Sequence, residues 1–372
     1  MKYYIIAGEA SGDLHGANLI RQLKLRDTNA VIHCWGGDLM QAQGASLIKH
    51  YKELAFMGFI EVIANLRAIL SNIDFCKRDI ENFNPDVLIL IDYPGFNLRI
   101  AEWAHAKGYK VIYYISPQIW AWKQSRVHII KKVVDKMFVI LPFEKDFYLK
   151  FGCEVIFVGH PLLDAIKNYR AMPNDNFLKS NGLGEKKIIA LLPGSRQQEI
   201  KTMLPLMIEA VKEHNHYQIV IAGAPSITPE FYKEFIKGTG AGIVYNQSYG
   251  LMQHANAALV TSGTATLEAA LFGVPQVVCY KGSALSYYIA RQLVKIKYIS
   301  LVNLIMNKEV VKELIQSELN SSNIKKELTK ILSVAGAAKM KKEYADLEQI
   351  LGGSGASGKT ATAIIDFLKT EK

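Results

Sequence analysis

The regular alternation of short apolar runs with helix-like segments constrains the fold of this chain more than any other feature. The runs are rich in β-branched and aromatic residues and are apolar on both faces, which is typical of parallel strands covered by helices on both sides. In the first half of the chain they span residues 2–8, 31–37, 86–92, 110–116, 136–141 and 154–159. The sequence therefore predicts an α/β fold with a doubly wound parallel sheet.

The alternation stops at residues 160–185, which are mostly polar or turn-forming, and then starts again. Further strand-like runs span residues 187–194, 217–224, 242–246, 257–263 and 275–281. A chain of 372 residues is long enough for about two domains. We therefore predict two doubly wound domains that face a cleft. The first spans residues 1–165 and is completed by C-terminal helices at about 345–372, the second spans residues 180–344, and only helix is expected after residue 308.

The net charge of +10, from 44 Lys and Arg against 34 Asp and Glu, indicates an acidic partner. A nucleic acid, an anionic membrane surface or a phosphate-rich substrate would each suit such a field. Part of the charge lies in residues 122–136, which fit the solvated face of an ordinary helix equally well. Because the sequence contains no recognisable nucleic-acid-binding motif, we predict no nucleic-acid partner.

The sequence pattern also argues against a membrane-spanning, a secreted or a metal-binding protein. The sequence contains no stretch of about 18 uninterrupted apolar residues, so we predict no membrane span. The opening apolar run is too short for a secretory leader, and a cytoplasmic protein is expected. No spacing of His, Cys, Asp or Glu compels a metal site, and we predict neither a metal nor another cofactor.

Residues 8–16, GEASGDLHG, form a glycine-rich turn after the first predicted strand. The candidate ligand-contacting residues in it are Ser11, Gly12, Asp13 and His15. The spacing does not match the dinucleotide-binding fingerprint, but glycines still allow a backbone to approach a sugar or phosphate closely. The structural alternative is a helix capped by Ser11 or Asp13. We interpret the turn as part of a binding site.

Asp92 directly follows an apolar strand, in the stretch LILIDYPGFN. Ligands of open parallel sheets bind beyond the carboxyl ends of the strands, so this carboxylate is expected at the binding edge. Partial burial there would raise its pKa, which suits a general base. The alternative is that Asp92 caps the helix that begins near Phe96. We predict a catalytic role for Asp92.

Two turns in the second domain place small residues directly before a helix. Their residues are Gly194, Ser195 and Arg196 in the first turn and Ser262, Gly263 and Thr264 in the second. The N–H groups and dipole of each helix would attract an anion, and Arg196 would add a guanidinium. Glu268 lies one helical turn beyond Thr264 and would accept hydrogen bonds from ribose hydroxyls. Capping explains either turn alone, but together they predict a nucleotide-diphosphate site.

Residues 353–360 match the P-loop pattern formally. A working P-loop connects a strand to a helix within a nucleotide-binding sheet. Here a helical stretch precedes the glycines and only a short segment follows them. We therefore predict no ATP binding, and we expect the glycines to separate two terminal helices.

A broad apolar stripe runs along the predicted helix at residues 56–73. The residues predicted to contact a membrane are Phe59, Val62, Ile63, Leu66, Ile69 and Leu70. The spacing fits a helix that faces the core. With few charges on it and a basic protein behind it, the stripe also fits a helix that lies on a bilayer surface.

Seven stretches occur in the order found in one enzyme family. They are AGEASGDLHGA, MGFIEV, DYPGFN, SPQIWAW, GHPLLD, LLPGSR and TSGTATLEAALFGVP, and they cover residues 5 to about 280. In these stretches the chain resembles the lipid-A-disaccharide synthases. The resemblance implies a GT-B glycosyltransferase of two Rossmann-like domains. It implies condensation of UDP-2,3-diacylglucosamine with 2,3-diacylglucosamine 1-phosphate (lipid X), giving lipid A disaccharide 1-phosphate and UDP.

The resemblance also implies roles for the candidate residues. Asp92 would be the general base that deprotonates the acceptor 6-hydroxyl, with His15 as the competing candidate. Arg196 would stabilise the leaving UDP together with the helix N-termini at Ser195 and Thr264, without a metal.

Further positions match the family near the nucleotide. They are Asn303 and Gln316, although Val302 stands where the family often has proline. The resemblance implies a peripheral enzyme on the cytoplasmic face of the inner membrane, with the basic charge attracting anionic lipids and the phosphate of the acceptor. The sequence leaves the oligomeric state open, a homodimer included.

Three other functions remain open from the sequence. The first is a GT-B enzyme that transfers from UDP-N-acetylglucosamine to a different lipid acceptor. The second is a UDP-sugar 2-epimerase, which would need no membrane stripe. The third is a binding module without catalysis, which would bind UDP and lose nothing when Asp92 is replaced.

Overall fold

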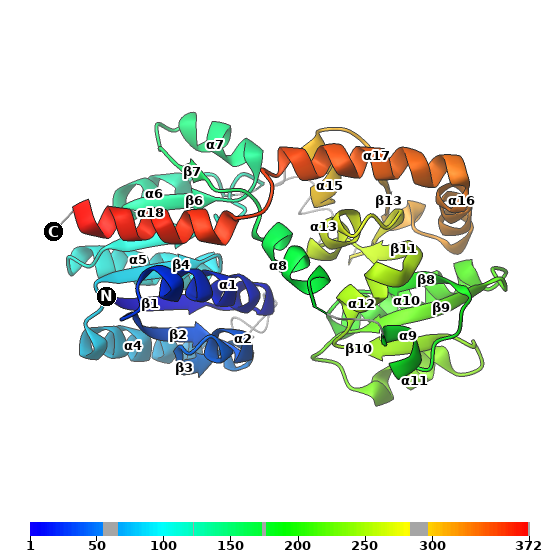
Figure 1. Cartoon of the computed structure of the whole chain (residues 1–372), viewed down its shortest axis with the longest axis horizontal. Coiled ribbons are helices and arrows are strands. Elements are labelled where there is room, and N and C mark those ends of the chain that lie inside the picture. The colour runs from blue at the N-terminus through cyan, green and yellow to red at the C-terminus, as the bar shows by residue number, and fades with distance from the viewer. Residues whose placement is uncertain (55–65, 122, 173–175, 283–296, 371–372) are drawn as a thin grey trace. The chain divides into compact units, whose positions relative to one another are not determined.

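The computed structural model describes residues 1–54, 66–121, 123–172, 176–282 and 297–370. The chain divides into two compact units (Figure 1). Unit 1 contains residues 1–165 and 351–372, and unit 2 contains residues 166–350. Helix α8 (Pro161–Arg170) begins in unit 1 and ends in unit 2.

Unit 1 is built on a parallel sheet with the strand order β3-β2-β1-β4-β5-β6-β7. The strands are β1 (Lys2–Ala7), β2 (Val31–Gly36), β3 (Ser46–His50), β4 (Val87–Ile91), β5 (Val111–Tyr114), β6 (Lys136–Val139) and β7 (Ile156–Phe157). Every residue of β4 is buried, as expected for an apolar strand covered on both faces. The strand order reverses between β1 and β4, and ligands of such sheets bind at the carboxyl ends of the strands at this switch point.

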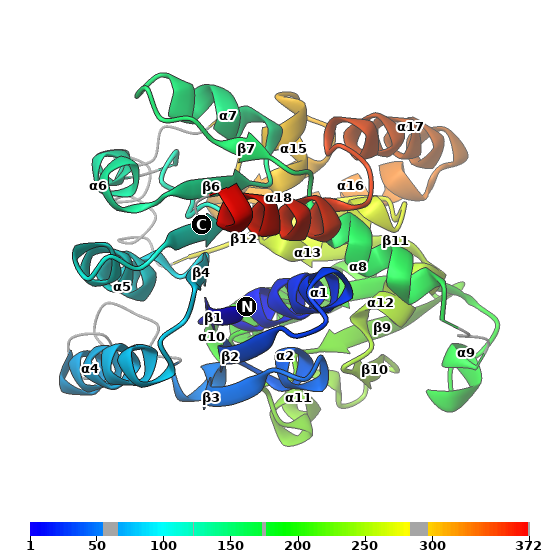
Figure 2. The same ribbon diagram turned by 60° about the vertical axis from the view of Figure 1, so that its left-hand side comes forward.

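Helices cover both faces of this sheet. They are α1 (Ala10–Arg26), α2 (Asp38–Ala42), α4 (Leu66–Phe83), α5 (Pro94–Ala106), α6 (Arg126–Val133), α7 (Pro142–Leu149) and α18 (Ala356–Thr370), with the 3-10 turn η1 (Tyr51–Glu53). Figure 2 shows α4, α5 and α6 on one face of the sheet and α1 and α18 on the other. Apolar side chains of α4, α5 and α6 pack against those of β1, β4 and β5 in one core cluster.

Unit 2 repeats the design with the strand order β10-β9-β8-β11-β12-β13, again with parallel pairing. Its strands are β8 (Lys187–Leu192), β9 (Tyr217–Gly223), β10 (Gly242–Tyr245), β11 (Ala255–Thr261), β12 (Gln276–Tyr280) and β13 (Lys312–Ile315). Its helical elements are α9 (Phe177–Ser180), α10 (Gln197–Val211), α11 (Pro229–Ile236), α12 (Ser248–His254), α13 (Thr264–Leu271), α15 (Leu301–Met306), η2 (Gln316–Glu318), α16 (Ser321–Leu332) and α17 (Val334–Ile350). The switch point of this sheet lies between β8 and β11.

The predicted fold class is confirmed, since each apolar run predicted as a strand contains one and both sheets are parallel and doubly wound. The cleft between the domains stays a prediction. The expectation of only helix after residue 308 is wrong, because β13 pairs with β12. The sequence of β13, KELI, is half polar and fits a helix as well as a strand. The edge strand β3 was missed for a similar reason, because its sequence SLIKH is only partly apolar.

Helix α18 completes unit 1 by packing along α1 (Figures 1 and 2). The side-chain Nε of Arg26 donates a hydrogen bond of 2.9 Å to Oγ1 of Thr362. At the N-terminus of α18 the carboxylate of Asp164 accepts hydrogen bonds from the backbone N–H groups of Gly355 and Ser357. The glycines of the P-loop-like stretch therefore separate α17 from α18, as predicted. The carboxylate of Asp164 accepts hydrogen bonds from backbone N–H groups there, as a bound phosphate does in a P-loop.

Candidate active site

Asp92 lies at the switch point of unit 1, directly after β4 and beside the end of β1. Burial, and after it the negative charge of Glu9, raise the pKa of its carboxyl to about 7, although a hydrogen bond from the backbone N–H of Tyr93 opposes the shift. The side chain is half-buried and keeps some access to solvent. Helix α5 begins at Pro94, and Asp92 does not cap it. A carboxyl with this pKa at a ligand-binding edge can accept a proton at neutral pH.

The glycines of residues 8–16 are required by packing. A Cβ at Gly8 would lie 2.4 Å from the ring of Tyr93, and one at Gly16 would lie 2.7 Å from Sδ of Met40. A Cβ at Gly12 would lie 3.0 Å from that of Ala7. Close packing at Gly8 and along the start of α1 therefore accounts for these glycines. The binding role of the turn stays a prediction.

Asp13 holds the neighbouring loop rather than a ligand. Its Oδ1 accepts hydrogen bonds from the backbone N–H groups of Gly37 (2.8 Å) and Met40 (3.0 Å), and its Oδ2 accepts one from Leu39 (3.1 Å). The carboxylate thus satisfies N–H groups at the start of α2 and does not cap its own helix α1. Asp13 is buried and both of its oxygens are engaged in holding this loop. Its contact with a substrate stays a prediction.

His15, the competing base, is buried beside a second histidine. Its ring meets that of His160 edge to face, with the centroids 6.5 Å apart. Burial lowers the pKa of His15 to about 4 and that of His160 to about 3, although the charge of Asp164 opposes the shift at His15. A buried imidazole with so low a pKa is a poor base at neutral pH. Ser11 lies one turn earlier, at the exposed start of α1.

In unit 2 the turn before α10 is closed by a side chain of its own helix. Gly194 has a φ of +111°, a conformation that glycine adopts without strain. Oε2 of Glu199 accepts hydrogen bonds from the backbone N–H groups of Ser195 (3.0 Å) and Arg196 (3.3 Å). The Arg196 guanidinium is largely exposed and lies 3.5 Å from Oε1 of Glu199. Glu199 therefore occupies the N–H groups that were predicted to hold an anion.

The turn before α13 is open by comparison. Its N-cap is Gly263, and among the described residues a Cβ there would meet nothing within 4 Å and no side-chain cap hydrogen bond is made. Thr264 is exposed, whereas the hydroxyl of Ser262 donates to the carbonyl of Ile299 at 3.1 Å. This turn follows β11, which pairs with β8, so both predicted anion-binding turns lie at the switch point.

Glu268 is half-buried in α13, one turn beyond the open N-terminus. The hydroxyl of Tyr249 donates a hydrogen bond of 3.1 Å to its Oε1. Burial raises the pKa of Glu268 above its ordinary value, and this hydrogen bond opposes the shift. Tyr249 was missed in the sequence because it lies on α12, remote in the chain from Glu268.

Asn303 is fully buried, and its amide is engaged within the protein. Its Nδ2 donates to the carbonyl of Val311 and to Oε1 of Glu313, and its Oδ1 accepts from the N–H groups of Val310 and Val311. This network fixes the segment before β13. The nucleotide contact of Asn303 stays a prediction.

Gln316 follows β13 at the carboxyl edge of the sheet, with a φ of +52°. Its Nε2 is buried without a hydrogen-bond partner among the described residues. A ligand carbonyl would satisfy this donor. Among the described residues, Gln316 thus has an unpaired side-chain donor, whereas the side-chain amide of Asn303 is fully engaged.

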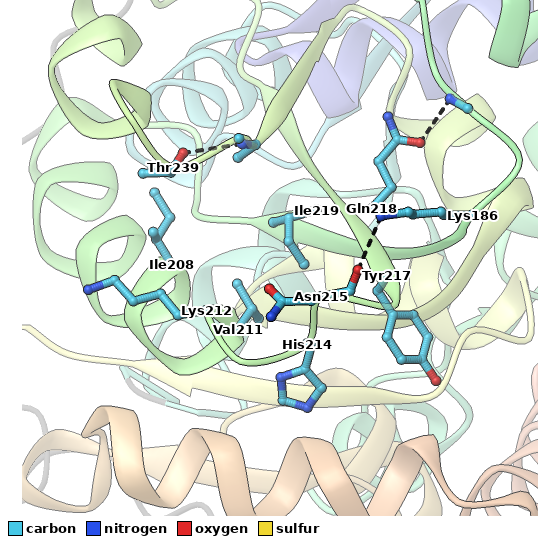
Figure 3. A pocket seen from close by; sticks show the side chains of 13 residues that line it. Lys186, Ile208, Val211, Lys212, His214, Asn215, Tyr217, Gln218, Ile219 and Thr239 are labelled. Carbon is cyan, nitrogen blue, oxygen red and sulfur yellow. Dashed lines mark hydrogen bonds between the residues drawn. The ribbon is translucent and has the colours of Figure 1, made fainter.

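A hollow of about 440 Å³ lies at the opposite edge of the unit 2 sheet (Figure 3). This hollow lies where β8 and β9 begin. Its lining residues include Lys186 and Tyr217. There Nζ of Lys186 donates to the carbonyl of Asn215 at 3.2 Å. Because ligands of such sheets bind at the carboxyl ends of strands, we assign this hollow no part in the nucleotide site.

The apolar stripe is described only from Leu66 onward, in α4, so Phe59, Val62 and Ile63 lie outside the described residues. Ile69 packs against the core of unit 1. Leu70 keeps 48% of its surface exposed. Within the described ranges, none of the helices has the length and apolar character needed to span a bilayer.

Two doubly wound parallel sheets are consistent with the GT-B fold. The fold is similar to that of UDP-GlcNAc 2-epimerase from Neisseria meningitidis bound to UDP-GlcNAc, with a TM-score of 0.71 at 14% identity over 98% of this chain and 100% of that one. It is also similar to the glycotransferase of kitacinnamycin, with a TM-score of 0.64 at 13% identity over 98% of each chain.

Sequence comparison identifies the family. The family model described as lipid-A-disaccharide synthetase matches residues 3–364. The chain is 39% identical to the lipid-A-disaccharide synthase of Syntrophus aciditrophicus, over 98% of this chain and 97% of that protein. It is 40% identical to that of Nitrosococcus oceani, over 88% and 86%. The chain belongs to the lipid-A-disaccharide synthetase family and is a glycosyltransferase of lipid A biosynthesis.

Proposed function

We propose that Asp92 is the general base of an inverting transfer from UDP-2,3-diacylglucosamine to lipid X. The observation that carries the proposal is the position of Asp92 at the switch point, with a pKa raised to about 7 by burial. The carboxylate takes the proton of the acceptor 6-hydroxyl as that oxygen attacks the anomeric carbon. The bond from this carbon to the diphosphate breaks, UDP leaves with the electron pair, and the product is the β-1,6-linked disaccharide 1-phosphate.

This proposal chooses Asp92 over His15. A base must reach the acceptor hydroxyl and must be unprotonated but basic at the working pH. His15 is 5% exposed and has a pKa near 4, so it meets neither requirement. Asp92 is the more accessible of the two and titrates near neutrality.

We further propose that unit 2 binds the UDP moiety. The N-terminus of α13 at Gly263 and Thr264, without a side-chain cap among the described residues, supports a diphosphate site, because the first N–H groups and the dipole of a helix attract anions. Glu268 would accept hydrogen bonds from the ribose hydroxyls, and Gln316 would donate to an acceptor on the nucleotide. Arg196 would approach the diphosphate as negative charge develops on the leaving group.

Replacing Arg196 with alanine should lower kcat/KM for the donor by about 100-fold, because one charged group that stabilises the leaving diphosphate is lost. Steady-state kinetics with varied UDP-sugar measure the effect. Lys212→Ala, which removes an exposed cation at the other end of α10, is the matched control and should leave kcat/KM unchanged. Equal kinetics for Arg196→Ala and Lys212→Ala would remove Arg196 from the site.

Transfer is distinguished from epimerisation by following the release of UDP. With purified protein and UDP-2,3-diacylglucosamine, UDP should appear only after lipid X is added. Release that is independent of lipid X, or conversion of the donor to its C2 epimer, would contradict a transferase and favour the alternative of a 2-epimerase.

We propose that the enzyme acts as a peripheral protein on the cytoplasmic face of the inner membrane, because both proposed substrates carry acyl chains. The exposed Leu70 on α4 and the net charge of +10 support contact with anionic lipid. Leu70→Glu should reduce cosedimentation with phosphatidylglycerol vesicles several-fold and leave the melting temperature unchanged. The control is Leu25→Glu, which adds the same charge at an exposed leucine of α1. Equal binding by the two variants would contradict contact through α4.

A further inference from the structure

The peptide of Asp92 is held at both of its polar atoms. Its backbone N–H donates to the carbonyls of Tyr114 (3.4 Å), the last residue of β5, and of Ile115 (3.2 Å), which follows it. Its carbonyl accepts hydrogen bonds from Nδ2 of Asn97, at 2.8 Å, and from the hydroxyl of Tyr113. The position of this residue is therefore fixed from the neighbouring strand β5 and from the helix α5 that follows it.

The backbone around Asp92 is strained. Asp92 and Tyr93 have φ values of +44° and +48°, and Ile115, across the hydrogen bond, has a φ of +66°. Such a φ is a genuine outlier for a β-branched residue, and backbone strain of this kind destabilises the folded chain. Conformations of this kind persist only where the surrounding structure enforces them. Hydrogen bonds to the Asp92 peptide are therefore needed to keep its carboxylate where the reaction requires it.

Tyr113 and Asn97 are fully buried, so neither contacts a substrate. Asn97 also donates to the carbonyl of Ile91 at 3.2 Å, so its amide joins the end of β4 to the strained turn. Burial, and after it the negative charge of the nearby Asp92 carboxylate, raise the pKa of the Tyr113 phenol well above its ordinary value. Both side chains use buried polar groups to hold this turn. Apolar residues of the same size could not form these hydrogen bonds.

We propose that Tyr113 and Asn97 are positioning residues for catalysis, which hold the strained turn of Asp92 and thereby aim its carboxylate at the acceptor hydroxyl. The proposal rests on the proposed role of Asp92 as the base. It assigns a catalytic consequence to two residues that make no contact with the reacting atoms, because a displacement of about 1 Å in a catalytic group can cost about 100-fold in rate.

The test is Tyr113→Phe, which removes one hydroxyl and keeps the ring. We expect kcat to fall about 10- to 100-fold with KM for the donor unchanged. The acid limb of the pH profile of kcat should also move to lower pH, because a loosened turn lets water reach the carboxyl and reduces the burial that raises its pKa. A purely structural defect would move neither kcat nor this limb.

Tyr4→Phe is the matched control, since this buried tyrosine in β1 bonds through its hydroxyl to Asp79 (2.7 Å) and Trp35 (2.8 Å). It should lower the melting temperature at least as much as Tyr113→Phe and leave kcat and the pH profile unchanged. Equal kinetics for the two variants would overturn the proposal. Asp92→Asn, measured alongside, distinguishes failure of the two proposals. If Asp92→Asn is active, Asp92 is not the general base. If Asp92→Asn is inactive but Tyr113→Phe has wild-type kinetics, only the positioning role is refuted.

Discussion

Replacing Asp92 with asparagine should lower kcat by about 1,000-fold and leave the affinity for UDP unchanged. A general base contributes about 100- to 10,000-fold to a proton-transfer step, and asparagine keeps the shape of the side chain while it cannot accept the proton. Affinity should persist because the groups proposed to bind UDP lie in unit 2. Steady-state kinetics and calorimetric titration with UDP measure the two quantities.

The pH dependence of the wild-type enzyme provides the internal check on this variant. The pKa of Asp92 is raised to about 7, so the active carboxylate is present above that pH and is lost as the pH falls through it. We therefore expect kcat to fall tenfold per pH unit below about 7. The residual rate of Asp92→Asn should lack this limb.

Asp86→Asn is the matched control, because Asp86 lies at the opposite end of β4 and accepts a hydrogen bond from the backbone of Lys2. It should keep the wild-type rate and profile. A wild-type rate in Asp92→Asn would contradict the base, and loss of UDP affinity together with kcat would indicate that Asp92 is needed for the fold of the site.

Replacing Asp13 with alanine should lower the free energy of unfolding by about 3–5 kcal/mol. Three backbone N–H groups, those of Gly37, Leu39 and Met40, would lose their acceptor, and each buried unpaired donor costs about 1–3 kcal/mol. Asp13→Asn keeps one carbonyl oxygen and should lose less. Urea denaturation at constant pH measures the change.

Asp38→Ala is the control for this effect. Asp38 begins α2 beside the same loop but is 76% exposed, and its ion pair with Lys52 should contribute little. We expect a change within about 0.5 kcal/mol for Asp38→Ala. If Asp13→Ala instead kept its stability and lost substrate affinity, the ligand-binding role expected from the sequence would be correct.

The features that could be predicted from the sequence are those encoded locally. Apolar runs that are buried on both faces identify parallel strands, and a carboxylate directly after such a run, Asp92, lies at the binding edge by topology alone. The half-polar strand β13 carries no such local signal. Its place in the sheet depends on pairing with β12, which the pattern of four residues cannot reveal.

The roles of buried polar residues depend on partners that are remote in the chain. Asp13 bonds to groups 24 to 27 residues away, and Asp164 bonds to the turn before α18, 191 to 193 residues away. In the sequence Asp13 is one polar residue among several in a glycine-rich turn, and Tyr113 is one apolar residue of a strand. Only the three-dimensional contacts distinguish a residue that binds a ligand from a residue that holds a ligand-binding loop in place.

The most direct test is mass spectrometry of the lipid products formed when the purified protein is incubated with UDP-2,3-diacylglucosamine and lipid X in detergent. We expect a tetraacylated disaccharide 1-phosphate and an equal amount of UDP from the wild-type enzyme, and only a trace from Asp92→Asn. A donor altered only at C2, or unreacted substrates in the presence of folded protein that binds UDP, would contradict the transfer reaction.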